Sequence, residues 1–275
     1  MDYLTRLAAA QSAEERTWII TESLIGSLAD DLRAAVWAAA IPHWFDEKIL
    51  AALRPELAEH AARLYADLQT LPFVEVFQGR GHNIHELTRK VMLDHLWEEN
   101  KEEYRILASR ALEYFSGDEP EVQLERMYHR IVAEVKEAGE VLWNYSSTFN
   151  SAFRFIDSEK AKNVLLEHSI AGRTSNSLKA NTLRAIGDIY FLHDERDNAN
   201  ASYLESLEIF KSIGDELGQT GVLWMLGKIC FVRYDLTNAL AYFLQALDLS
   251  RDVGDRLGEA NTLRAIGDVQ QFRKE

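Results

Sequence analysis

Two histidines and one glutamate in the N-terminal half have side chains suited to metal chemistry: His82, His85 and Glu86. Imidazole nitrogens and carboxylate oxygens are common zinc ligands, and a catalytic zinc site normally takes three protein ligands. The order here is His-x-x-His-Glu, whereas the zinc motif His-Glu-x-x-His places both histidines on one face of a helix. Because a histidine pair in a loop without a clear third ligand is a weak site, we predict no bound metal.

Three carboxylates, Glu134, Glu137 and Glu140, could act as acid and base if they faced a dry pocket that shifted their pKa values. Nothing in the sequence around them indicates such a pocket, so we expect a solvated helix face. The chain also shows no nucleophile beside a base and no Gly-x-x-x-x-Gly-Lys-Ser/Thr phosphate loop. We therefore expect a protein that is not an enzyme and that uses no cofactor.

Charge and cysteine content restrict the partners and the compartment. The 275 residues have a formal net charge of -14, which argues against a general polyanion binder, because phosphate binding needs a concentrated Lys/Arg surface. Cys230 is the single cysteine, which excludes an internal disulfide and is typical of a reducing compartment. It occupies a packing position, where we expect a buried, unreactive thiol. Without a signal peptide or an apolar run of roughly 18 residues, the chain should be cytoplasmic and should not enter a membrane.

A nine-residue sequence that occurs twice organises the C-terminal part. ANTLRAIGD stands at residues 180–188 and again at residues 260–268, and a fainter copy at residues 220–228 keeps Leu223 and Gly227 in the matching places. The period is therefore 40 residues, which is typical of stacked units that cannot bury their apolar faces alone. Four prolines and long Ala/Leu/Glu/Arg stretches predict a mostly α chain that ends in an α-solenoid.

Each unit shows a pair of helical patterns in which small residues stand where two helices touch and large ones fill the gap between neighbours. These units resemble tetratricopeptide (TPR) repeats with long linkers. The matching residues are Leu183, Ile186, Gly187, Tyr190, Ala199 and Tyr203 in the first unit, with Ser206 in place of the last Ala, and Leu223, Leu226, Gly227, Cys230, Ala239, Phe243 and Ala246 in the second.

The resemblance to TPR proteins implies a partner-binding face, because the first helix of each TPR lines the concave side of the superhelix. Asn can bond a peptide backbone through both ends of its amide, and Arg can hold a carboxylate with two parallel bonds. Such a face fits an extended or helical peptide of a protein partner. The residues that match the family's binding positions are Asn181, Arg184, Asp188, Phe191, Trp224, Lys228, Phe231, Asn261, Arg264 and Asp268.

Some of these assignments have alternatives. Arg184 and Asp188 are four residues apart and either face a partner or pair with each other on the helix surface. Trp224 either anchors a partner or belongs to the core between repeats. The third unit begins at Ala260 and contains only its first helix, so we expect the natural protein to continue. The other readings are a lone capping helix and self-association through this half repeat.

The N-terminal part predicts another architecture. Helical stretches at residues 29–40, 45–54 and 56–71 each end at a proline, which lacks the N–H and clashes with the preceding turn. A strand at residues 73–77, a turn at 78–81, a second strand at 83–85 and a helix from Glu86 follow. This is the order of a winged helix. We therefore divide the chain into a helical lead-in (1–28), a winged-helix-like domain (29–100), a helical hairpin linker or degenerate repeat (101–172) and a TPR solenoid of two full units and half of a third (173–275).

In winged-helix DNA readers the third helix enters the major groove. Here the acidic residues of that helix oppose only His60 and Arg63, and the wing carries Arg80 alone. Because groove binding needs several cations, we do not expect nucleic acid as a partner. A DNA-binding transcriptional regulator under TPR control is the alternative function.

Residues 28–115, with AAAIPHWFDEKILAAL and LPFVEVFQGRGHNIHELTRKVMLDHLW, resemble the winged-helix module that follows the nucleotide-binding domain in STAND (NB-ARC and NACHT type) signalling ATPases. Ile84-His85-Glu86 is similar to the family's Met-His-Asp motif, whose histidine reaches the β-phosphate of ADP. The resemblance implies that His85 is a nucleotide sensor for an upstream or separate ATPase domain. The other reading packs His85 at the strand-to-helix corner, where it caps backbone N–H groups.

Because the chain lacks a phosphate loop, the resemblance makes it either a fragment of a longer ATPase or a relative that lost the ATPase domain. The favoured function is a non-enzymatic protein-interaction and signalling module. In this interpretation the TPR groove binds a peptide or partner protein, as in the sensor half of a STAND protein.

Overall fold

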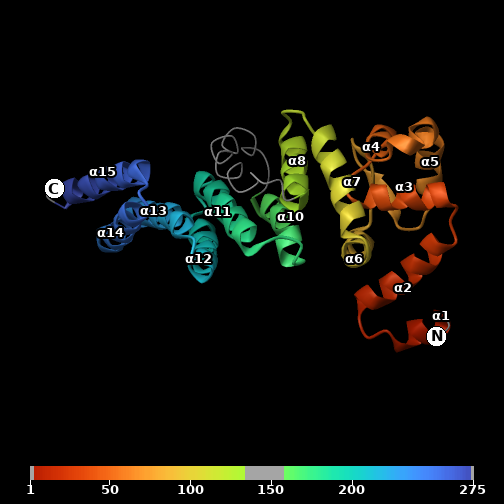
Figure 1. Cartoon of the computed structure of the whole chain (residues 1–275), viewed down its shortest axis with the longest axis horizontal. Helices are drawn as coiled ribbons and strands as arrows, with labels where there is room; N and C mark the ends of the chain where they lie inside the picture. The colour runs from red at the N-terminus through yellow and green to blue at the C-terminus, as the bar shows by residue number, and fades with distance from the viewer. Residues whose placement is uncertain (1–2, 134–157, 274–275) are drawn as a thin grey trace. The chain divides into compact units, whose positions relative to one another are not determined.

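Helices dominate the structure, a computed structural model that describes residues 3–133 and 158–273 (Figure 1). The chain divides into two compact units, residues 1–133 and residues 134–275. The predicted mostly α fold with a short β hairpin and a solenoid-like helical stack is confirmed. The glutamates considered for catalysis, Glu134, Glu137 and Glu140, lie outside the described residues.

The first unit contains helices packed around a hairpin. Ser12 and Asp46 each accept a hydrogen bond from a backbone N–H in the first turn of the helix that they precede, which fixes where those helices begin. In chain order the elements are α1 (Tyr3–Ala9), α2 (Ala13–Gly26), α3 (Asp30–Ala40), α4 (Glu47–Leu53), the 3₁₀ helix η1 (Pro55–His60), α5 (Ala61–Leu68), β1 (Val74–Phe77), β2 (Gly81–Ile84), α6 (Glu86–Glu99), α7 (Lys101–Tyr114) and α8 (Pro120–Ala133).

The third helix predicted at residues 56–71 is partly wrong, because this stretch forms η1 followed by the short α5, which ends at Leu68. Pro55 stands at the first position of η1, where a missing N–H breaks no helical hydrogen bond. The proline therefore starts a tight 3₁₀ turn as well as ending the helix before it, and 3₁₀ turns are frequent at helix N-termini.

The second strand begins at Gly81, earlier than predicted. The antiparallel register pairs Val74 with Ile84 and Phe77 with Gly81. Gly81 has a φ of +99°, and a Cβ there would lie 2.5 Å from the backbone oxygen of Phe45. Phe45 in turn exchanges two backbone hydrogen bonds with His82. Glycine is needed because the hairpin crosses the α3–α4 connection at backbone contact distance.

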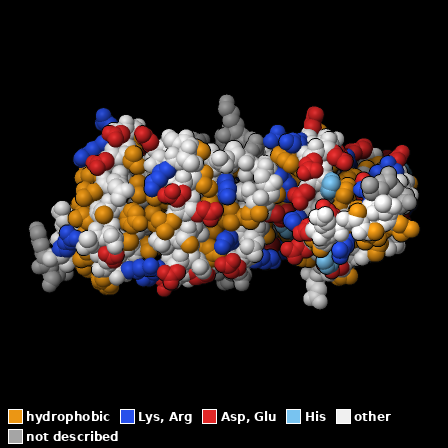
Figure 2. Space-filling model, turned by 90° about the horizontal axis from the view of Figure 1, so that it is seen from below, with side chains coloured by type: hydrophobic (Ala, Val, Ile, Leu, Met, Phe, Trp, Pro, Cys, Tyr) orange, Lys and Arg blue, Asp and Glu red, His pale blue; other side chains and the backbone are white. Residues whose placement is uncertain are grey.

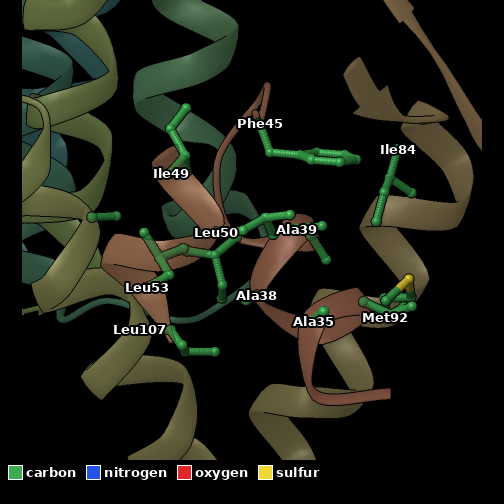
Figure 3. Close-up of a cluster of buried hydrophobic side chains, with 14 of the residues drawn as sticks. Ala35, Ala38, Ala39, Phe45, Ile49, Leu50, Leu53, Ile84, Met92 and Leu107 are labelled. Carbon is green, nitrogen blue, oxygen red and sulfur yellow. The ribbon is translucent and has the colours of Figure 1, made fainter. Parts of the chain in front are cut away.

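One apolar core joins the helices of this unit. Figure 3 shows side chains from α3, α4, β2, α6 and α7 directed toward one another, with Leu50 near the centre and Met92 and Leu107 on either side. Ile25 of α2 and Val132 of α8 belong to the same cluster. The lead-in helix and α8 are therefore stabilised by the same burial as the helices around the wing.

A buried charged group fixes α8 to the connection that follows α3. The Glu125 carboxylate accepts hydrogen bonds from the backbone N–H of His43 at 2.9 Å, and it lies 2.8 Å from Nδ1 of His43 and 3.0 Å from Nε2 of His129. Burial alone would raise the pKa of Glu125, but the two histidines outweigh it and hold the pKa far below its usual range. Burial also lowers the pKa of His129, although Glu125 opposes this.

Both shifts predict that the first unit loses stability in acid. The pKa of His129 lies below its ordinary value of 6.5 in the folded state, and that of Glu125 lies below its ordinary 4.5, so the unfolded chain binds more protons in both windows. We expect the thermal midpoint to be flat between about pH 8 and 7, to fall below about pH 6.5 and to fall again below about pH 4.5. Circular dichroism melts across this range test the prediction. In Glu125→Gln the second fall should become smaller, and a midpoint independent of pH would contradict the assignment.

The second unit is a stack of helical hairpins (Figure 1). The helices are α10 (Ser158–Ile170), α11 (Asn176–Leu192), α12 (Arg196–Ile213), α13 (Glu216–Val232), α14 (Leu236–Asp252) and α15 (Arg256–Phe272). The pairs α11–α12 and α13–α14 are the two full repeats, and α15 packs on α14 as the first helix of a third. α10 packs on α11 at the start of the stack, where the Tyr190 hydroxyl donates to Glu159 at 2.5 Å.

The turns between these helices follow the 40-residue period. Gly214 and Gly254 end α12 and α14 with left-handed φ values of 70° and 72°, a conformation that glycine adopts without steric cost. The aspartates that follow, Asp215 and Asp255, cap α13 and α15 by accepting from the backbone N–H three residues later. The repeated sequence therefore produces repeated geometry in the linkers as well as in the helices.

Glycine also determines how closely the two helices of a repeat approach. A Cβ at Gly187 would lie 2.6 Å from the ring of Tyr203, and a Cβ at Gly227 would lie 2.5 Å from the ring of Phe243. The predicted packing of small residues against large ones is therefore confirmed at Gly187 and at Gly227. Cys230, predicted to be buried, is half-buried instead. Burial raises the pKa of its thiol, as does Asp235, so the thiolate is disfavoured.

Candidate partner-binding site

The predicted binding residues come from three helices of the second unit. α11 carries Asn181, Arg184, Asp188 and Phe191, α13 carries Trp224, Lys228 and Phe231, and α15 carries Asn261, Arg264 and Asp268. The structure brings some of them together and separates others.

The ammonium group of Lys228 is the centre of the group that does assemble. Its Nζ lies 5.0 Å from the ring centroid of Phe191 and 4.8 Å from that of Trp224, so it stands over one aromatic ring from each repeat. Such cation–π contacts become stronger as the cation is desolvated. Burial lowers the pKa of Lys228, while the negative charge of Asp188 opposes this. We call Phe191, Trp224 and Lys228 the cation–aromatic site.

The carboxylate of Asp188 acts on the charge of Lys228 and is also bonded to the second helix of its own hairpin. It accepts a hydrogen bond of 2.6 Å from the hydroxyl of Tyr203 on α12. Burial raises the pKa of Asp188, and Arg184, Tyr203 and Lys228 oppose that rise. Burial lowers the pKa of Arg184 to about 10, so Arg184 is still charged at neutral pH. Arg184 and Lys228 therefore both act on Asp188, and Asp215 also acts on Arg184.

Arg184 does not fit either reading of the sequence fully. The residue is 7% exposed, so it interacts with Asp188 in the interior of the repeat and not on the helix surface. It acts from inside the repeat as a buried positive charge next to Asp188. Tyr203 was expected only as a packing residue, and its hydrogen bond to Asp188 was not anticipated. In the next repeat, Phe243 stands in place of Tyr203 and Lys228 in place of Asp188. The hydroxyl and the carboxylate are thus lost together, which was a signal in the sequence for that bond.

Trp224 agrees in part with each of its two predicted roles, the core between repeats and the anchor for a partner. It is half-buried and packs against the apolar cluster of α14 and α15, which agrees with a place in the core between repeats. Its ring also faces Lys228, and its indole Nε1 is buried without a hydrogen-bond acceptor in the described structure.

The other predicted residues lie apart from Lys228. Phe231 makes an edge contact with Phe272 of α15 at 5.3 Å between centroids. The side chain of Asn181 donates to the Ser177 carbonyl of its own helix, and Asn261 is half-buried on α15. Arg264 and Asp268 are exposed, unlike their counterparts Arg184 and Asp188. The ten residues therefore do not form one continuous ladder of contacts in the described structure.

His85 is placed at the start of α6 with an exposed side chain. Its backbone N–H donates to Phe73, but its side chain makes no capping hydrogen bond, so the predicted packed and capping role is wrong. The nucleotide-sensor role stays a prediction. Its neighbour His82 contacts the hydroxyl of Tyr65 through Nδ1 at 2.7 Å. Among the described residues, no group of three or more His, Cys, Asp or Glu is arranged to hold a metal ion.

Two arginines of the winged-helix-like region, Arg63 and Arg80, have acidic neighbours. Arg80 lies 3.5 Å from Glu119 and 3.2 Å from Glu121 and stands over the ring of Trp44, and Arg63 pairs with Asp31. On the face shown in Figure 2, Lys and Arg side chains are interspersed with Asp and Glu. This arrangement does not favour phosphate contacts by the third helix or the wing.

No helix in the described ranges has both the length and the apolar character required to cross a bilayer.

Comparison with known proteins returned little. No protein-family model matches the chain, and no curated protein is significantly similar to it. Among solved structures, the chain is similar to a Signal Transduction ATPase with Numerous Domains (STAND) protein with a tetratricopeptide repeat sensor from Pyrococcus horikoshii, at 12% identity and a TM-score of 0.35. The similarity covers 99% of this chain and 52% of that protein, so the chain spans about half of its length.

Proposed function

We propose that the chain is a non-enzymatic protein-interaction and signalling module whose repeats bind an acidic peptide segment of a partner protein. The observation that carries this proposal is the cation–aromatic site, where Lys228 joins Phe191 of one repeat to Trp224 of the next. A half-buried ammonium over two rings is a recognition feature because it combines charge with flat apolar surface.

The chemistry of the expected ligand follows from the charge and the burial of Lys228 at this site. The desolvation of Lys228 is only partly offset by the negative charge of Asp188, so the pKa of Lys228 remains lowered. A ligand carboxylate supplies one negative charge, so it would offset the desolvation of Lys228. An Asp or Glu side chain, or a C-terminal carboxylate, is the group that we expect the site to select.

The proposal predicts that acidic peptides bind and that Lys228→Met weakens them. Methionine keeps an unbranched apolar stem between the rings but removes the charge, so the apolar packing is retained. Peptides chosen by display selection against the whole chain should be enriched in Asp and Glu. Their affinity for Lys228→Met, measured by fluorescence anisotropy, should fall by about tenfold or more.

Lys211 on α12 offers the matched control. It is exposed and pairs with Glu208 on its own helix, so Lys211→Met removes the same charge away from the site. Affinity should stay within about twofold for that variant. Equal losses for the two variants would reduce the effect to overall charge, and peptides that ignore Lys228→Met would refute the proposed site.

We also propose that the first unit relays binding to a nucleotide-binding ATPase domain, as its resemblance to the STAND module suggests. The exposed side chain of His85 at the N-terminus of α6 supports this, since helix N-termini favour phosphate groups. ADP should leave the complex of this chain with such a domain faster after His85→Ala. Unchanged release would remove His85 from that role.

A further inference from the structure

A hollow of about 450 Å³ lies between α1, α2 and α6 of the first unit. Hollows of about 300–1,000 Å³ are of the size that holds a small organic ligand. The most buried of the residues that line this one are apolar: Ala10, Ile19 and Val91. The floor of the hollow therefore suits an apolar group.

One wall of the hollow is a stacked pair of rings. Trp18 of α2 and His95 of α6 both line it, and their ring centroids are 3.7 Å apart with 10° between the ring planes. Trp18 also contacts Trp37 at 6.4 Å between centroids and packs against the apolar core of the unit. Because this packing already holds Trp18 in place, a ligand that contacts it does not have to order the wall first.

The charged residues that line the hollow are mostly acidic. Glu14 and Glu15 belong to the first turn of α2, and Asp94 belongs to α6. Among the described lining residues, the guanidinium of Arg6 is the cation, and it lies 2.6 Å from the carboxylate of Glu22. Three carboxylates therefore face one arginine whose charge another carboxylate already offsets.

We propose that this hollow binds a small organic cation, a primary ammonium on an apolar body. The body would pack on the floor and on Trp18, and the ammonium would donate to the carboxylates of Glu15 and Asp94. Glu14 has a cation nearby, since its carboxylate lies 3.4 Å from Nζ of Lys90. A ligand with a carboxylate of its own would meet like charge here. The proposal does not depend on the function proposed for the repeats.

A lysine side chain of a partner protein offers the same chemistry but is a poorer occupant. The hollow has walls from three helices and the size of a small-molecule site. A stable interface between proteins needs a total buried area of about 1,200–2,000 Å², most of it outside such a hollow.

Phenethylamine is a suitable probe, because it places an ammonium on a short apolar body. Added to the whole chain at neutral pH, it should shift the NMR signals of the Trp18 indole and of the amides around Asp94 saturably, with a Kd of about 1 mM or tighter. 2-Phenylethanol has the same body without the charge and should bind about fivefold more weakly. Equal affinities for the amine and the alcohol, or shifts that map to another part of the chain, would refute the proposal.

Ala9→Phe tests the location. Ala9 and Ala8 are both exposed on α1, but only Ala9 is among the residues that line the hollow. Ala9→Phe should fill the hollow and weaken phenethylamine by about tenfold, whereas Ala8→Phe should leave its affinity within about twofold. Circular dichroism melts check that both variants are folded. Equal losses in the two variants would contradict the site.

The double variant Glu15→Gln, Asp94→Asn tests the charge. It should weaken phenethylamine by about fivefold and leave 2-phenylethanol unchanged, because only the ammonium loses its acceptors. A loss that is equal for both probes would show that the carboxylates only support the fold, and the proposal would fail. If the amide of Nα-acetyl-lysine binds more tightly than phenethylamine, the occupant is a basic side chain of a partner protein and the proposal is wrong.

Discussion

Replacing Gly187 by leucine should destabilise the repeat unit by about 3 kcal/mol or more, whereas the same change at Gly267 should cost nothing or stabilise it by up to about 1 kcal/mol. A Cβ at Gly187 would already lie 2.6 Å from the fully buried ring of Tyr203. The hydroxyl of that ring is bonded to Asp188, so the ring cannot move aside without losing a hydrogen bond. At Gly267 only the gain in helix propensity over glycine remains.

The pair is well matched because both glycines stand in the same sequence, ANTLRAIGD, within helices of equal length. Intrinsic helix propensity therefore cancels between the variants, and the difference reports the contact alone. Urea denaturation followed by circular dichroism measures the change in unfolding free energy, and hydrogen exchange in α11 and α12 locates it. Similar effects at the two positions would show that Tyr203 does not pack as described.

The sequence predicted the repeat unit well because its signals are local and periodic. Gly187 and Gly227 indicated close helix contacts, and the structure confirms them. The turns were less predictable, since Asp194 and Tyr234 adopt left-handed φ values of 62° and 60°, and tyrosine rarely adopts this conformation. Their identical spacing of 40 residues shows that the period carries structure even where the residues differ.

The candidate site was predictable only in part. Phe191, Trp224 and Lys228 were named from family positions, but the contact of Lys228 with the two rings depends on how far one repeat is rotated on the next. That rotation comes from packing across the whole interface, which a sequence pattern does not record. The burial of Arg184 was not predicted either, because an arginine in a helical pattern is normally expected at the surface.

In the first unit, the polar contacts between residues far apart in the sequence could not be predicted. Arg89 donates to the backbone oxygens of Ile41 and Pro42 and to the hydroxyl of Tyr128, which joins α6, the α3–α4 connection and α8. Glu125 and His43 are 82 residues apart in sequence. Nothing in the spacing of these residues indicates that they meet, and buried charges are rare enough that the default expectation is exposure.

Glu125→Ala should destabilise the first unit by about 3–5 kcal/mol, a large part of the 5–15 kcal/mol that holds a typical domain together. The substitution leaves the backbone N–H of His43 and the buried imidazole of His129 without their acceptor, and it opens space beside α8. Glu125→Gln should cost less, because an amide oxygen can still accept from one of these groups. Urea denaturation followed by tryptophan fluorescence measures all three proteins.

Glu121 on the same helix is the control, because its side chain is 43% exposed and pairs with Arg80, whereas Glu125 is buried. Glu121→Ala should change the unfolding free energy by less than about 1 kcal/mol. If Glu125→Ala behaved like Glu121→Ala, the carboxylate would have to be reached by water in the folded protein. The acid sensitivity expected from its lowered pKa would then vanish as well, so the two measurements test one buried group independently.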